Sequence, residues 1–240
     1  MPEIALVAAL EREVWPLLKT WRQVEREYAG HPFRFFETAN CVAVCGGMGA
    51  EAARRATQAA IALYEPATVE SVGFAGALER GLRVGQVLEP RFVIDASDGS
   101  RVDTGTGSGI LVSFAFVAGK VEKAKLADAY AAQAVDMEAA AVARGAQAHG
   151  VRFRAVKVIS DEASFPWPEL EHFAGRDGRF REGAFALHAA LRPWLWATVL
   201  RLAWNSWTAA RALSGHLKVM EQAAPGRPAS DGADQDHPGS

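Results

Sequence analysis

The segment VDMEAAAVARGAQAHGVRFRAVKVISDEA, residues 135–163, carries two groups of acids that one folding unit would bring together. Asp136 and Glu138 lie where a short strand leads into an Ala-rich helix, and Asp161 follows the apolar run RFRAVKVIS. Interpreted as a βαβ unit, the segment returns its second strand parallel to the first. Glu138 and Asp161 would then both lie near the carboxyl ends of strands, which form the edge where open α/β sheets bind ligands.

Apolar runs of β type alternate with Ala-rich runs along the rest of the chain. Strands are expected at IALVAAL, FRFFET, CVAVC, ATVESVGFAG, QVLEPRFVID and GILVSFAFV, and helices through Trp15 and Leu18, over 50–63 and over 121–130. This rhythm predicts an α/β sheet covered by helices on both faces. We expect an α/β domain over 1–191, an amphipathic helical appendage over 192–218 and a disordered tail over 219–240, which is rich in Pro, Gly and Asp.

Charge and cysteine content narrow the class of protein. The formal net charge is −2 and no block of Lys and Arg is present, so nucleic acid is not expected as a partner. Cys41 and Cys45 share a face of one strand but lie about 13 Å apart at ~3.3 Å per residue, beyond the reach of a disulfide. CxxxC without further ligands does not predict a metal site. With no basic leader before IALVAAL, we expect a cytoplasmic protein with reduced thiols.

A glycine-rich turn, VAVCGGMGAEA, places Gly46, Gly47 and Gly49 between a strand and a helix. It fits the dinucleotide-binding fingerprint loosely, with Ala at the last position. A Rossmann unit needs this turn after the first strand and an acid at the end of the second, whereas Glu70 lies inside ATVESV. Dinucleotide binding is therefore the less favoured interpretation of this turn.

The pairing of VDMEAAAVA with VISDEA resembles the signature of the nucleoside phosphorylase and nucleosidase superfamily, which includes the methylthioadenosine/S-adenosylhomocysteine nucleosidases. The resemblance covers about residues 3–190. It implies a three-layer sandwich with a mixed central sheet, and cleavage of the purine N-ribosidic bond of an adenosine-type nucleoside. Asp161 would be the general acid toward purine N7, which requires burial to keep its carboxyl protonated. Glu138 would bind the ribose 2′-hydroxyl.

Further pocket residues follow from the same resemblance. Glu13 in ALEREV matches the Glu that activates the attacking water, although three charges opening a helix would also suit an ordinary solvated first turn. Phe116 matches the aromatic that stacks on the purine, and Val117 the residue whose backbone reads the base edge. The alternative is a plain buried strand with two aromatic residues, which would explain Phe114 equally well. Met48 is expected to face the 5′ substituent, and Met137 to line the pocket beside the signature acids.

The turn SVGFAG bears on the nucleophile. Hexameric purine phosphorylases carry an Arg and a Ser around this turn to hold phosphate, whereas this chain has Ser71 and Phe74. Without a guanidinium a phosphate dianion would be poorly compensated, so water is the expected nucleophile and no cofactor is implied. Arg12, Arg54 or Arg55 could supply a cation from elsewhere, which keeps phosphorolysis open. A non-catalytic nucleoside-binding module, with Phe74 blocking the nucleophile, is the second alternative.

The carboxyl-terminal third, with FPWPELEHFAGRDGRFREGAF and ALRPWLWATVLRLAWNSWTAARAL, resembles the hopanoid-associated branch of the superfamily, which acts on an adenosyl-linked hopane lipid. The region between Val93 and Gly109 is short, which implies an open pocket end for a bulky 5′ group. The Trp-rich helix has a narrow polar stripe through Arg201 and Asn205 and a wide apolar arc. It would either dock on its own sheet or a partner subunit, or lie on the inner face of the membrane. We expect a homo-oligomer.

Overall fold

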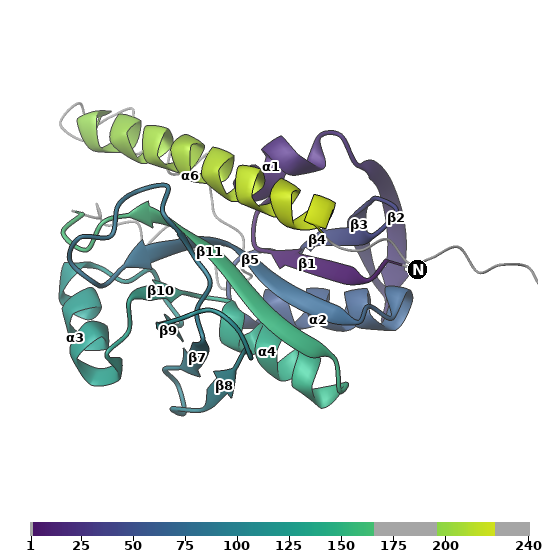
Figure 1. The fold of residues 1–240 in the computed structure, drawn as a ribbon, viewed down its shortest axis with the longest axis horizontal. Helices are drawn as coiled ribbons and strands as arrows, with labels where there is room; N and C mark the ends of the chain where they lie inside the picture. Colours follow the sequence, from purple (N-terminus) through teal and green to yellow (C-terminus); the bar gives the residue numbers. More distant parts are fainter. Residues whose placement is uncertain (1, 166–195, 224–240) are drawn as a thin grey trace, which may run out of the picture.

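The computed structural model describes residues 2–165 and 196–223, which form one mixed sheet with helices on both faces (Figure 1). The strands are β1 (Ile4–Ala8), β2 (Arg22–Tyr28), β3 (His31–Glu37), β4 (Cys41–Cys45), β5 (Thr68–Ala77), β6 (Val87–Leu88), β7 (Phe92–Asp95), β8 (Arg101–Asp103), β9 (Ile110–Ser113), β10 (Ala134–Asp136) and β11 (Arg152–Asp161). The helices are α1 (Glu11–Leu18), α2 (Ala50–Tyr64), α3 (Lys120–Tyr130), α4 (Ala139–Ala148) and α6 (Trp196–Ala223). The predicted three-layer α/β sandwich is confirmed.

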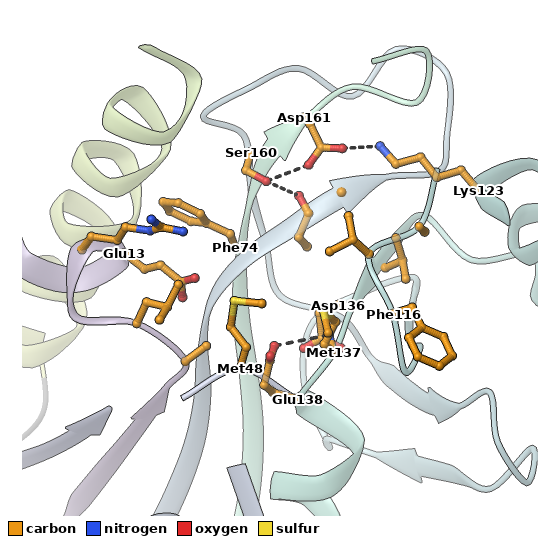
Figure 2. Close-up of a pocket in the computed structure, with 18 residues that line it drawn as sticks. Glu13, Met48, Phe74, Phe116, Lys123, Asp136, Met137, Glu138, Ser160 and Asp161 are labelled. Atoms are coloured by element: carbon orange, nitrogen blue, oxygen red, sulfur yellow. Dashed lines mark hydrogen bonds and ion pairs between the residues drawn. The ribbon is translucent and has the colours of Figure 1, made fainter. Parts of the chain in front are cut away.

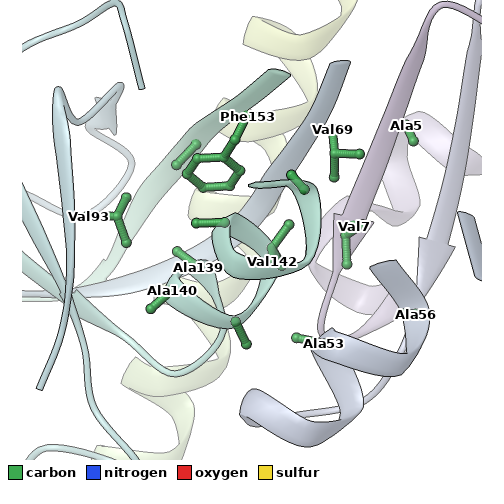
Figure 3. Close-up of a cluster of buried hydrophobic side chains, with 14 of the residues drawn as sticks. Ala5, Val7, Ala53, Ala56, Val69, Val93, Ala139, Ala140, Val142 and Phe153 are labelled. Atoms are coloured by element: carbon green, nitrogen blue, oxygen red, sulfur yellow. The ribbon is translucent and has the colours of Figure 1, made fainter. Parts of the chain in front are cut away.

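Helices α2 and α4 cover one face of the sheet through a close-packed layer of small residues (Figure 3). Ala53 and Ala56 of α2 and Ala139 of α4 are buried against valines of the strands. A Cβ atom added at Gly145 would lie 2.8 Å from Thr57 Cγ2, so the two helices approach too closely for a larger residue there. Most residues of the central strands β1, β4, β5 and β11 face either this layer or the layer opposite, which is why these strands are nearly continuous hydrophobic runs.

Strand β5 organises the site because it pairs with three strands. Its parallel partner β11 follows one edge from Thr68 to Gly76. On the other edge, β1 pairs in parallel as far as Ser71, and β10 pairs antiparallel at Gly76 and Ala77. Residues 72–75 therefore lie between the ends of β1 and β10, and it is here that the pocket described below opens onto β5.

The expected parallel βαβ unit is wrong in one respect. Strand β10 runs antiparallel to β5, whereas β11 runs parallel to it. The reason is that all three residues of β10 pair in parallel with β9, whereas only two of them pair with β5, at its carboxyl end. Val135 and Asp161 nevertheless both register with Gly76, so the two acidic segments do meet.

Two strands and two element boundaries also differ from those expected from the sequence. Strands β2 and β8 were not expected, and the strand predicted to reach Val117 ends at Ser113. Cys41 is buried and Cys45 is partly buried on β4, and no disulfide joins the two. Helix α6 continues to Ala223, past the expected start of the tail at 219. The rest of the predicted tail, 224–240, lies outside the described residues, and the division into a domain and an appendage stays a prediction.

Helix α6 packs against α1 and β11 on the face opposite α2 and α4 (Figure 1). Its buried side carries Ala209, Leu213 and Leu217. Asn205, from the expected polar stripe, is buried too, while Trp204 and Trp207 are 66% and 51% exposed. These two tryptophans of the apolar arc thus face away from the sheet. Within the described residues no helix is both long and apolar enough to cross a membrane.

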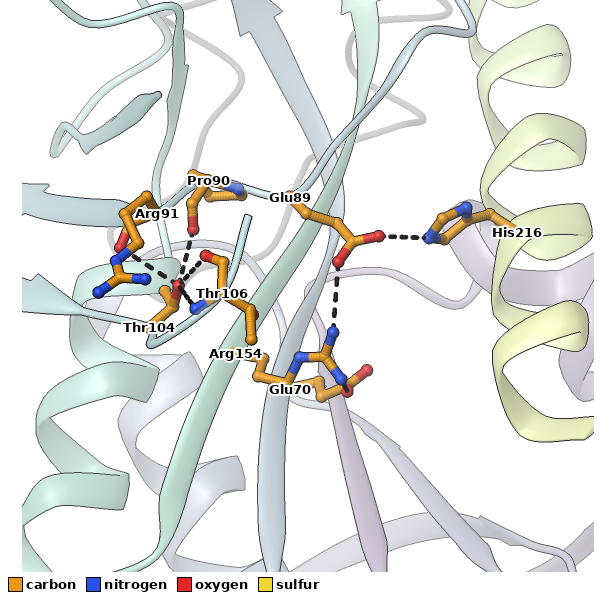
Figure 4. A network of polar contacts seen from close by, with 8 residues as sticks. All are labelled: Glu70, Glu89, Pro90, Arg91, Thr104, Thr106, Arg154 and His216. Atoms are coloured by element: carbon orange, nitrogen blue, oxygen red, sulfur yellow. Dashed lines mark hydrogen bonds and ion pairs between the residues drawn. The ribbon is translucent and has the colours of Figure 1, made fainter. Parts of the chain in front are cut away.

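A chain of polar contacts links the same helix to the sheet (Figure 4). His216 of α6 lies 3.0 Å from Glu89, and Arg154 lies 3.3 Å from Glu89 and 3.7 Å from Glu70. Glu70 is buried on β5, and loss of hydration raises the pKa of its carboxyl despite the nearby Arg154. This network fixes the carboxyl-terminal half of α6 relative to β5 and β11.

Candidate active site

All eight residues expected to form a site line one pocket at the carboxyl ends of β1, β5 and β11 (Figure 2). They are Glu13, Met48, Phe74, Phe116, Val117, Met137, Glu138 and Asp161. In Figure 2, Glu13 and Phe74 lie on one side of the pocket and Lys123 and Phe116 on the other. The structure therefore brings all eight together in one pocket.

Glu13, in the first turn of α1, is a buried acid with an unsatisfied oxygen. Its Oε2 has no hydrogen-bond partner among the residues described, and the residue is only 7% exposed. Loss of hydration, together with the negative charge of Glu138, raises the pKa of Glu13 to about 8, against the opposing effects of Lys157, Arg12 and a backbone hydrogen bond from Phe74. A carboxyl in this state suits a base that titrates near neutral pH.

Space for Glu13 comes from a glycine on the facing strand. Gly73 has φ 142°, a conformation that L residues rarely adopt, and a Cβ atom there would lie 2.5 Å from Glu13 Oε2. The carboxylate of Glu13 therefore rests directly against the backbone of β5.

Glu138 is held by the glycine-rich turn. The backbone N–H of Gly49 donates to Glu138 Oε1 at 2.7 Å, and that of Met137 to Oε2 at 3.3 Å. Gly49 is the N-cap of α2, so the carboxylate sits at the positive end of that helix. Loss of hydration and the charge of Asp136 nevertheless raise the pKa of Glu138. An anion of the protein thus occupies the helix end that a dinucleotide would need, which argues against the dinucleotide interpretation.

Beneath Glu138 lies a buried ion pair that was not foreseen. Lys157 Nζ of β11 is 2.9 Å from Asp136 Oδ2 and 3.0 Å from Ser71 Oγ, and Ser113 donates to Asp136 Oδ1 at 2.6 Å. Loss of hydration disfavours the charged form of Lys157, but the acids Asp136, Glu138 and Glu13 outweigh it and raise the pKa of Lys157. One cation therefore compensates several acids of the site. A lone Lys in the apolar run RFRAVKVISD was the available signal, because a buried Lys requires acidic partners.

Asp161 is buried, and it forms an ion pair that was not foreseen. Its Oδ2 forms an ion pair with Lys123 of α3, and its Oδ1 accepts a hydrogen bond from Ser160 Oγ at 2.8 Å. Lys123 was also missed, because KVEKAK is typical of an exposed helical surface. Of the other cations considered, Arg12 lines the pocket, whereas Arg54 pairs with exposed Glu51 at 2.7 Å.

The apolar lining is uneven in exposure. Phe116, beyond the end of β9, is 67% exposed at the pocket rim, and Phe114 packs edge-on to it with ring centroids 5.9 Å apart. The pair therefore does not belong to a plain buried strand. No group of three His, Cys, Asp or Glu side chains in residues 2–165 and 196–223 is arranged to hold a metal ion.

Comparison with known proteins agrees with this architecture. The sequence profile of the phosphorylase superfamily matches residues 3–114 and 109–187. The 5′-methylthioadenosine/S-adenosylhomocysteine nucleosidase of Helicobacter pylori superposes with a TM-score of 0.69 at 18% identity, covering 92% of this chain and 98% of that one. The corresponding nucleosidase of Neisseria meningitidis gives 0.69 at 19% identity, covering 93% and 100%.

Futalosine hydrolase of Helicobacter pylori gives a TM-score of 0.64 at 20% identity, covering 91% of this chain and 98% of that one. Comparison with curated protein sequences gives no match. At these identities the structural likeness concerns the fold, while the profile match extends over most of the sequence. The chain belongs to the phosphorylase superfamily.

Proposed function

We propose that the protein hydrolyses the N-ribosidic bond of an adenosine-type purine nucleoside that carries a 5′ substituent. The observation that carries this proposal is the convergence of Glu13, Glu138 and Asp161 on one pocket of a phosphorylase-superfamily fold. The solved nucleosidases with this fold act on 5′-substituted adenosines by name, which supports the same class of substrate here.

In the proposed reaction the C1′–N9 bond breaks, its electron pair stays with the purine, and the ribosyl group becomes positively charged. Glu138 would bind the 2′-hydroxyl through a hydrogen bond that strengthens as that charge develops. Glu13 would take a proton from the water that attacks C1′. On the opposite side Asp161 would act as the general acid that protonates purine N7. Phe116 would stack on the base, and the backbone of Val117 would contact its edge. Met48, Met137 and Phe74 would contact the sugar and its 5′ group.

Water is favoured over phosphate because the residues of the SVGFAG turn do not offer a phosphate clamp. Ser71 is fully buried and accepts a hydrogen bond from Lys157 in the core. Phe74, the other residue at a position that would hold phosphate, presents an aromatic ring to the pocket. Neither group can neutralise a dianion.

A purine-release assay with product analysis tests the proposal. Adenosine and methylthioadenosine should yield free purine and ribose without phosphate, even in excess phosphate. Asp161→Asn should keep ligand affinity but lose about 10²–10⁴-fold in turnover, and Glu138→Gln should lower kcat more than affinity. Asp128→Asn, on the exposed side of α3, is the matched control. Ribose-1-phosphate as the main product would indicate a phosphorylase, and binding without turnover a non-catalytic module.

A finer proposal concerns the 5′ group and the membrane. Trp204 and Trp207 of α6 lie side by side with ring centroids 5.2 Å apart, and Arg211 lies 4.8 Å from the Trp207 ring. Exposed Trp beside Arg suits contact with an anionic bilayer, where each basic residue adds on the order of 1 kcal/mol. Such contact would suit a lipid-linked substrate such as adenosyl-hopane, which stays a prediction, as does homo-oligomerisation.

Liposome co-sedimentation tests the membrane contact. The protein should sediment with anionic vesicles and less so with neutral ones, and Trp204→Ser combined with Trp207→Ser should reduce binding while sparing cleavage of soluble nucleosides. If the double variant instead dissociates an oligomer and the wild type stays in the supernatant, the tryptophans belong to a subunit interface.

A further inference from the structure

Glu162, the residue that follows Asp161, is held by arginines from two other parts of the fold. Its Oε1 lies 3.2 Å from Nη1 of Arg83, in the loop between β5 and β6, and its Oε2 lies 4.0 Å from Nη2 of Arg201 on α6. The Glu162 side chain is 27% exposed, whereas those of the two arginines are 73% and 57% exposed. A partly buried carboxylate therefore joins the carboxyl end of β11 to a surface loop and to a helix.

The pairing of β11 with β5 becomes irregular where Asp161 stands. Ile159 registers with Ala75, but the next registered pair is Asp161 with Gly76, so β11 carries one residue more than β5 over this step. An irregularity of this kind bends the strand and re-aims a side chain beside it. The direction of the Asp161 side chain therefore follows less from the regular ladder than from contacts in the turn that comes next.

The turn after β11, residues 161–165, is closed by its own backbone and contacted a second time by α6. The N–H of Phe165 donates to the carbonyl of Glu162 at 2.9 Å, and the Phe165 side chain is buried. The guanidinium of Arg201 lies 5.4 Å from the centre of the Phe165 ring, within the range of a cation–π contact. Arg201 thus contacts the turn at Glu162 and again at Phe165, and Arg83 adds another contact at Glu162.

We propose, resting on the nucleosidase function above, that Glu162 is a positioning residue: held by Arg83 and Arg201, it fixes the turn and so aims the Asp161 carboxyl at the purine. Asp161 remains the group that touches the base, and Glu162 acts only through it. Ion pairs with partners this exposed contribute little to the free energy of folding. A reacting group displaced by about 1 Å, in contrast, can cost about 10²-fold in rate. Loss of Glu162 should therefore affect turnover more than stability.

The experiment measures kcat and KM for purine release from adenosine, a soluble substrate that needs no membrane. Glu162→Ala should lower kcat about 10–100-fold and change KM by less than about threefold. Arg83→Met combined with Arg201→Met should reproduce this loss, because it removes both partners of the carboxylate. Arg80→Met, at an exposed position of the same loop as Arg83, is the matched control and should behave as wild type.

A combined variant distinguishes a positioning role from an independent one. If Glu162 acts through Asp161, Glu162→Ala should lower kcat no further in an Asp161→Asn background. Losses that multiply in the combined variant would overturn the proposal, because Glu162 would then act by itself. A normal kcat for Glu162→Ala together with a lowered melting temperature would overturn it too, since the contacts would then only fasten α6 to the sheet.

The two arginine positions keep the test informative if Glu162→Ala does not fold, because both side chains are largely exposed and the same comparison is made in the Asp161→Asn background. A wild type that cleaves no nucleoside would remove the nucleosidase function and this proposal with it. An impaired Asp161→Asn beside an unimpaired Glu162→Ala would remove the positioning role alone.

Discussion

Replacing Glu13 by Gln should stabilise the protein at neutral and higher pH while abolishing the proposed hydrolysis. The reason is the pKa of Glu13, raised from 4.5 to about 8 chiefly by loss of hydration and by Glu138. Between those two values the unfolded chain releases the proton and the folded protein keeps it, so stability is fully present below pH 4.5 and falls as pH rises to about 8. At about 1.4 kcal/mol per pH unit, the loss reaches at most about 5 kcal/mol above pH 8.

Urea unfolding at pH 5, 6, 7 and 8 measures this effect. Glu13→Gln should unfold at nearly the same urea concentration as wild type at pH 5 and be more stable by several kcal/mol at pH 8, within the limit of about 5 kcal/mol. Glu11→Gln, in the same helical turn but partly exposed and paired with Arg34, is the control and should show little pH-dependent gain. A Glu13→Gln variant whose advantage does not grow with pH would refute the claim that Glu13 is forced to stay protonated by its surroundings.

The other predictions concern the same pocket. The kcat/KM of wild type should rise with pH up to about 8, because the proposed base must be ionised; a profile flat from pH 6 to 9 would remove Glu13 from that role. Gly73→Ala should lower turnover at least about tenfold and cost about 1–3 kcal/mol of stability, because the alanine Cβ would lie 2.5 Å from Glu13 Oε2 in a strained backbone conformation. Purine release measures the loss of turnover, and calorimetry measures the loss of stability. Lys157→Met should destabilise by about 3–5 kcal/mol in urea, because Asp136 would be left buried without its cation, and a loss below about 1 kcal/mol would contradict that pairing.

The strands that position the site could be predicted from sequence because their apolar runs are buried on both faces, as in β1, β4, β5 and β11. Strand β2, RQVEREY, could not, because it forms the edge of the sheet and all seven of its residues remain at least partly exposed. The direction of β10 was also out of reach. A three-residue strand carries no pattern that says which of two neighbours it will follow.

The site residues divide in a similar way. The acids could be predicted because the motifs that carry them, VDMEAAAVA and VISDEA, are local in sequence. The two lysines that compensate them could not be assigned to the site. Lys123 meets Asp161 across 38 positions of sequence, and only the packing of α3 beside β11 makes that pairing visible. Asn205 is a case in which sequence pattern gave no sign of burial: it is a polar residue of the polar stripe, but the packing of α6 buries it.

The contact between Gly49 and Glu138 has a consequence for substrate choice. Helix ends in α/β proteins commonly attract phosphate, yet here the start of α2 is already neutralised by a carboxylate of the same chain. If the ribose binds at Glu138 as proposed, a nucleotide phosphorylated on its ribose hydroxyls would bring a second anion to that spot, where Lys157 is already paired with Asp136. Electrostatic repulsion should accordingly make the pocket bind nucleosides whose ribose hydroxyls are unphosphorylated and reject the corresponding phosphate esters.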